Sequence, residues 1–120
     1  MKLRIRGNTL RIRLSEMEAD LLFEGKPVMD ATCFPSAELA YIVQPSTLNS
    51  IDFVENTIQL NLDKVKINEW AKSEQVAISI EIATQSENIL SILVEKDFKC
   101  LTVRPEDESG LFPNPNAPHG

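Results

Sequence analysis

The residues with the clearest capacity for chemistry are five basic side chains near the start of the chain. They are Lys2, Arg4, Arg6, Arg11 and Arg13. Arginine guanidinium groups form paired hydrogen bonds with carboxylate and phosphate oxygens, so such a cluster can bind an anion. Residues 1–14 contain these five cations and no acidic residue, whereas the whole chain holds 12 basic and 18 acidic residues and carries a net charge of −6. This basic cluster is the leading candidate for a binding site.

Alternation of residue types predicts that these cations share one surface. Basic and apolar residues alternate on both sides of Gly7-Asn8, which is typical of a β-hairpin with a type II′ turn. With these two residues as the loop, Ile5 faces Leu10 and every apolar side chain lies on one side of the hairpin. Every cation then lies on the other side, and a shift of one residue would destroy this sorting.

Like charges that face each other across paired strands repel, so we expect something to offset the basic surface. One hypothesis is an external ligand, either a small anion or an acidic protein. The other is neutralisation by acids of the same chain, among them Glu106, Asp107 and Glu108. Nucleic acid is the least favoured partner. Residues 15–120 hold 7 basic and 18 acidic side chains, and phosphates would repel this excess of negative charge.

A second, weaker candidate is the acidic and thiol-bearing segment that contains Glu95, Asp97 and Cys100. These groups could ligate a metal or supply a nucleophile, but their spacing matches no established ligand pattern, and structural zinc normally needs four ligands. A Cys–His dyad would require His119, the single histidine, to lie beside Cys100. We therefore predict no metal.

Known cofactor and catalytic motifs are absent from the sequence. It contains no glycine-rich phosphate loop, no C-x-x-C and no H-E-x-x-H, so we expect no cofactor. The favoured function is a non-enzymatic binding or self-assembly module, which would contact an acidic partner, a small anion or a second copy through exposed strand edges. The alternative is a small enzyme that uses carboxylates and arginines in the mouth of a curved sheet.

Hydrophobic periodicity predicts an α+β domain that is mostly β. A helix should begin at the capping box of Ser15 and Glu18 and end at Gly25. A second helix should follow Asp63 and continue to about residue 72. The sequence also predicts two strands, at residues 27–34 and 38–44, a second hairpin at residues 50–62, and a final hairpin whose strands span 76–82 and 89–95. Together with the first hairpin they make a curved antiparallel sheet or open barrel of about seven to eight strands. No internal repeat of fixed period is visible.

The predicted domain organisation is one globular domain over residues 1–104 and a proline-rich acidic C-terminal tail over residues 105–120. The chain shows no signal peptide and no apolar run of about 20 residues that could cross a bilayer. We therefore expect a cytoplasmic protein without membrane contact. In that compartment Cys33 and Cys100 are expected to be free thiols, partly or wholly buried.

Three segments resemble a family of small bacterial proteins with no assigned function. They are MKLRIRGNTLRIRL at the start, LVEKDFKCL at residues 93–101 and FPNPN at residues 112–116. The resemblance covers most of the chain, and its most specific part is EKDFKCL. It implies one domain and a bacterial source, and it transfers neither an activity nor a functional residue.

Overall fold

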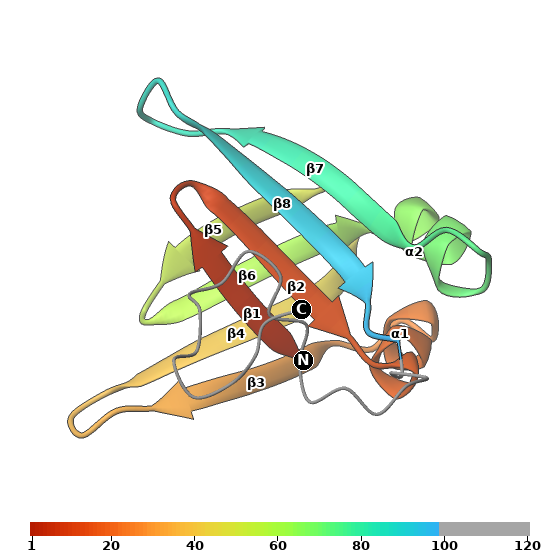
Figure 1. Cartoon of the computed structure of the whole chain (residues 1–120), viewed down its shortest axis with the longest axis horizontal. Helices are drawn as coiled ribbons and strands as arrows, with labels where there is room; N and C mark the ends of the chain where they lie inside the picture. The colour runs from red at the N-terminus through yellow and green to blue at the C-terminus, as the bar shows by residue number, and fades with distance from the viewer. Residues whose placement is uncertain (99–120) are drawn as a thin grey trace, which may run out of the picture.

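The computed structural model describes residues 1–98, which form eight strands and two helices (Figure 1). This composition confirms an α+β fold that is mostly β. In chain order the elements are β1 (Lys2–Arg6), β2 (Thr9–Leu14), α1 (Glu16–Phe23), β3 (Val28–Cys33), β4 (Glu38–Ser46), β5 (Ser50–Val54), β6 (Thr57–Asp63), α2 (Lys64–Ala71), β7 (Ala77–Ala83) and β8 (Ile89–Lys96). No helix within residues 1–98 is long and apolar enough to cross a membrane.

The strands form two separate four-stranded sheets instead of one curved antiparallel sheet or open barrel. The first sheet has the order β1-β2-β8-β7 and the second has the order β3-β4-β6-β5. Each sheet consists of two antiparallel hairpins, joined through a central parallel pair, β2–β8 or β4–β6. The expectation of purely antiparallel pairing was wrong at these two junctions, because residue alternation determines which face a side chain occupies and not which distant strand lies beside it.

The register of three hairpins agrees with the sequence prediction. Ile5 lies opposite Leu10, Ile51 opposite Leu60 and Ile80 opposite Ile92. Gly7 has a φ of +54° while Asn8 keeps a negative φ, as a type II′ turn requires. In the β5–β6 loop both central residues, Glu55 and Asn56, have positive φ, the pattern of a type I′ turn.

The two sheets reveal an internal repeat that is not visible in the sequence. The chain consists of two ββαββ units, β1–β4 with α1 and β5–β8 with α2, and the first hairpin of each unit pairs with the second hairpin of the other. Buried residues correspond at a spacing of 48 positions: Leu10, Ile12, Leu14, Ala19 and Leu22 match Ile58, Leu60, Leu62, Ile67 and Trp70. The repeat is hidden in the sequence because most matched positions hold different apolar residues. The pattern of burial therefore repeats, whereas the amino-acid sequence does not.

An asparagine begins the parallel pairing in both units. The backbone N–H of Ser91 donates to the carbonyl of Asn8 over 3.1 Å, and that of Ala40 donates to the carbonyl of Asn56 over 2.9 Å. The Asn8 side chain also donates to the Ile89 carbonyl over 2.9 Å. The same turn position therefore connects the hairpins of both sheets.

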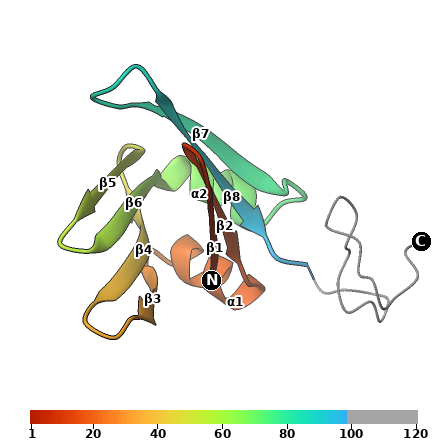
Figure 2. The same cartoon turned by 60° about the vertical axis from the view of Figure 1, so that its left-hand side comes forward.

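Both helices lie at the same end of the two sheets, and Figure 2 shows them between the sheets. Burial is complete at that end and decreases toward the hairpin turns. On the inner faces, Leu62 and Val94 are fully buried, whereas Ile5 is 57% exposed and Phe53 is 61% exposed. The core therefore depends on the helices to join the sheets.

Both helices begin at the predicted N-caps. The Ser15 hydroxyl accepts from the Glu18 N–H over 3.2 Å, and the Glu18 carboxylate accepts from the Ser15 N–H over 2.9 Å, which completes the capping box. The Asp63 carboxylate accepts from the Val65 N–H over 2.9 Å. Gly25, just after α1, has a φ of +88°, a conformation that other residues adopt with strain.

Removing either cap should destabilise the protein by a similar amount, because the two helices occupy equivalent places. We predict that Ser15→Ala and Asp63→Ala each lower the free energy of unfolding by about 1 kcal/mol, measured by urea denaturation. Ser36→Ala, in an exposed turn, is the control and should change it by less than about 0.5 kcal/mol. Equal stability of the Ser15 and Ser36 variants would contradict the capping role.

Candidate anion-binding site

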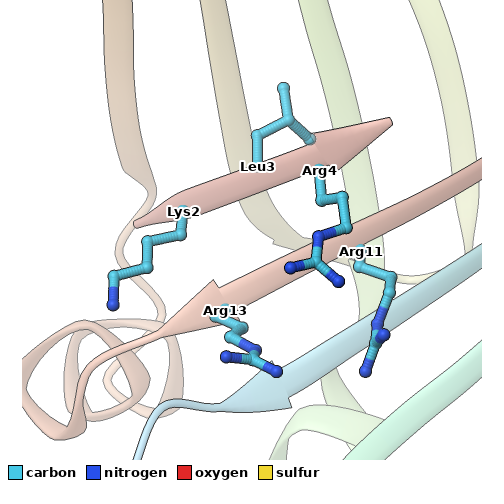
Figure 3. Close-up of a pocket in the computed structure, with 5 residues that line it drawn as sticks. All are labelled: Lys2, Leu3, Arg4, Arg11 and Arg13. Atoms are coloured by element: carbon cyan, nitrogen blue, oxygen red, sulfur yellow. The ribbon is translucent and has the colours of Figure 1, made fainter. Parts of the chain in front are cut away.

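The cations of the first hairpin gather on the outer face of the first sheet. We call Lys2, Arg4, Arg6, Arg11 and Arg13 the basic face. Lys2 lies opposite Arg13, and Arg4 lies opposite Arg11. These four side chains and Leu3 line a hollow of about 200 Å³. In Figure 3 the four basic side chains extend to one side of the hairpin, whereas Leu3 extends to the other.

Strand β8 brings an acidic side chain against this face. Glu95 is the parallel neighbour of Arg13. Its two carboxylate oxygens accept from Arg11 Nε over 3.2 Å and from Arg11 Nη2 over 3.1 Å, a two-pronged ion pair. Arg13 Nε lies 3.5 Å from Glu95 Oε1. One carboxylate therefore holds two arginines in place.

This arrangement changes the acidity of Glu95. The hydrogen bonds from Arg11 are the largest influence and lower the pKa of the Glu95 carboxyl group below its ordinary value. Partial desolvation opposes that shift, and the positive charges of Arg11 and Arg13 add to it. Glu95 therefore remains ionised at neutral pH.

The acids described at this face neutralise it only in part. Besides Glu95, Asp97 lies 3.0 Å from the ammonium group of Lys2. Two carboxylates thus face the four cations of the hollow, which leaves two positive charges in excess. Within residues 1–98, no acidic side chain forms a salt bridge with Arg4 or Arg6.

Among the described residues, internal neutralisation of the basic face is partial and comes from Glu95 and Asp97. The acids named for that role, Glu106, Asp107 and Glu108, lie outside the described residues. Nothing in the sequence joined Glu95 to Arg11, because the two are 84 positions apart and meet only through the parallel pairing of β2 with β8.

Only part of the weaker candidate site lies within the described residues. Glu95 and Asp97 lie at the basic face, while Cys100 and His119 fall outside the described residues, as does the domain boundary proposed at residue 104. Carboxylates engaged by arginine and lysine are poorly available to a metal ion. Among residues 1–98, no group of three His, Cys, Asp or Glu side chains is placed to hold one.

In the second sheet, uncharged residues occupy the positions that match Glu95 and two residues of the basic face. By register, Gln44, Asn61 and Ser50 correspond to Glu95, Arg13 and Lys2. Gln44 Nε2 donates to Asn61 Oδ1 over 2.7 Å, and Asn61 Nδ2 donates to Ser50 Oγ over 2.9 Å. Neutral amides therefore satisfy this position of the fold, so the fold does not itself require the charges of the basic face.

Cys33 differs from its predicted burial, because it is exposed at the end of β3 beside the β3–β4 turn. Its thiol donates to Glu38 Oε1 over 3.3 Å. That hydrogen bond, followed by the negative charge of Glu38, raises the pKa of the Cys33 thiol. A raised pKa lowers the fraction of Cys33 present as thiolate, which is the nucleophilic form.

The ion pairs of Glu95 should make stability depend on pH. The pKa of Glu95 is lower in the folded protein than in the unfolded chain, so ionised Glu95 stabilises the fold. This stabilisation is complete above the unfolded-state pKa of about 4.3 and is lost as the pH falls through the folded-state pKa. The difference in free energy of unfolding between wild type and Glu95→Gln should therefore shrink toward zero on acidification. Urea denaturation at a series of pH values measures this difference.

The control for that experiment removes the partners. In a background of Arg11→Met and Arg13→Met, Glu95→Gln should produce a smaller pH-dependent difference, because the groups that lower the pKa of Glu95 are gone. A difference that grows as the pH falls would contradict the ion-pair assignment.

Comparison with known proteins identifies a family and no relative of known function. No curated protein and no solved structure matches the chain. The profile of a family of unknown function, DUF7009, matches residues 1–116, which covers both ββαββ units. The earlier resemblance to a family without an assigned function is thereby confirmed, and this chain belongs to the DUF7009 family.

Proposed function

We propose that this domain is a non-enzymatic binding module whose basic face binds an anionic group, a carboxylate or a phosphate, of a small molecule or an acidic partner. The observation that carries the proposal is the hollow of about 200 Å³ lined by Lys2, Arg4, Arg11 and Arg13. Its cations exceed the acids described around it by two charges. A ligand with one or two negative charges would complete the neutralisation.

The ion pairs of Glu95 favour binding by fixing the arginines in advance. Arg11 uses Nε and Nη2 for Glu95, and Arg13 approaches it through Nε, which leaves further guanidinium donors for a ligand. A long side chain that is already held loses less conformational entropy when a ligand arrives. Glu95 thus lowers the net charge of the site but organises it for an anion.

Catalysis has less support than binding at this position. A general acid or base works best with a pKa near the working pH, whereas the pKa of Glu95 moves away from neutrality. The hollow also lies on the outer face of the first sheet, and not between strands in the mouth of a curved sheet, where the enzymatic alternative required it.

Arg4 offers the sharpest test because no acid among the described residues pairs with it. Isothermal titration with inorganic phosphate, pyrophosphate and citrate should detect binding that weakens as salt is added. We predict that Arg4→Glu reduces the affinity at least tenfold and leaves the melting temperature within a few degrees of wild type. Lys64→Glu, on the exposed side of α2, is the matched control and should leave the affinity unchanged.

A charge-reversing substitution of Arg11 or Arg13 is less informative, since either change also breaks an ion pair with Glu95. If Arg4→Glu and Lys64→Glu bind these anions equally well, the proposed site is wrong. A large loss of stability in Arg4→Glu would instead assign Arg4 to charge pairing within the chain and would also overturn the proposal.

A further inference from the structure

Three of the four sheet edges carry features that block pairing with another strand. On β3, the Asp30 carboxylate accepts from the N–H of Ala31 over 2.8 Å, and on β5 the Asp52 carboxylate accepts from the N–H of Phe53 over 2.8 Å. Edge strand β1 carries three of the cations of the basic face. Occupied amides and like charges both oppose the addition of a second copy.

Strand β7 is the fourth edge, and its outward backbone groups differ. The N–H of Lys96 donates to the Val76 carbonyl, so alternate residues from Val76 onward direct their backbone groups toward β8. The groups of Ser79 and Glu81 therefore point away from the sheet. Within residues 1–98 no side chain hydrogen-bonds to them; the nearest such contact is from Gln75 Nε2 to the Ala77 carbonyl, over 2.9 Å.

The sequence of β7, AISIEIA, is nearly symmetric about Ile80. If two copies of β7 pair in antiparallel fashion with Ile80 opposite Ile80, every residue meets a similar or compatible one. Ile78 then lies opposite Ile82 on the inner face, while on the outer face Ala77 lies opposite Ala83 and Ser79 lies opposite Glu81. No two like charges face each other.

The backbone agrees with this register. The outward groups of Ser79 meet those of Glu81 in the second copy, as a hydrogen-bonded antiparallel pair requires. A register centred on Glu81 would place two carboxylates opposite each other, and one centred on Ser79 would leave Ile82 and Ala83 beyond the paired region. The register centred on Ile80 alone places all seven residues of β7 opposite one another without a charge conflict. The Ala77 carbonyl, which accepts from Gln75 Nε2, lies at the end of this pairing, while the outward groups of Ser79 and Glu81 lie at its centre.

We infer that two copies of this chain associate through β7, in a symmetric dimer centred on Ile80. The first sheets of both copies then form one continuous sheet of eight strands, since each contributes β1, β2, β8 and β7. The two-fold axis runs perpendicular to that sheet, so both basic faces lie on the same side. Their β1 strands are separated by seven interstrand spacings, roughly 34 Å. This inference does not depend on the proposed anion binding.

The mass of the full chain in solution tests the association. Size-exclusion chromatography with light scattering should give twice the chain mass of 13.5 kDa. We predict that Ser79→Pro returns the protein to the monomer mass and leaves the melting temperature of the fold nearly unchanged, because proline removes an N–H that points away from β8. Thr57→Ser, distant on β6, is the control and should stay dimeric.

Disulfide cross-linking tests the register even if the proline variant folds poorly. In a Cys33→Ser, Cys100→Ser background, one variant carries Ser79→Cys and another carries Glu81→Cys. Each variant alone should cross-link slowly, because identical positions lie two residues out of register. The equimolar mixture should form a disulfide-linked dimer rapidly, since directly opposite residues lie within disulfide range.

A monomer mass for the wild-type chain would overturn the inference. So would a dimer whose mass is unaffected by Ser79→Pro, or cross-linking no faster in the mixture than in the separate variants, since either would place the interface elsewhere. Anion binding by a monomer would leave the proposed function intact, so the two proposals can fail independently.

Discussion

The parallel pairing of β2 with β8, and of β6 with β4, is the interaction on which the rest of the molecule depends. In an isolated hairpin each strand has only one neighbour and the apolar face stays largely exposed to water. Such a two-stranded sheet is at best marginally stable. Exchange of hairpins between the two ββαββ units gives every sheet four strands. The same exchange carries Glu95 to Arg11, so the fold and the electrostatics of the candidate site have one origin.

The repeat also separates structural from functional roles among polar residues. At matched positions one sheet has an amide chain through Gln44 and Asn61, and the other has charged groups around Glu95. Partly exposed ion pairs add little stability, because solvation and side-chain entropy offset most of the attraction. Because neutral amides occupy the matched positions of the second sheet, folding alone does not account for the charged cluster, which is the reason to propose a ligand.

Local features of this chain were predictable from sequence, and distant ones were not. The registers of the β1–β2 and β5–β6 hairpins follow from alternation and two-residue turns, and that of the β7–β8 hairpin follows from alternation across a longer turn. The helix starts follow from Ser15 and Asp63. Each of these signals lies within a few residues of the feature that it predicts. The basic face could be predicted for the same reason. The partnership of Glu95 with that face could not, since a parallel pair leaves no local signature. The exposure of Cys33 was not predicted, because cysteine is usually buried. Cys33 is exposed because it ends β3 beside a turn.

The exchange of hairpins has a consequence for how the protein is made. The apolar side of β2, formed by Leu10, Ile12 and Leu14, is complete after 14 residues have been synthesised, but its neighbour β8 ends at Lys96. A ribosome must therefore release nearly all of the described chain before the first sheet can close. Since closing such long loops is slow, the nascent N-terminal hairpin has to wait with its apolar surface uncovered. Its five cations, which repel other copies emerging nearby, would keep it from aggregating during that interval.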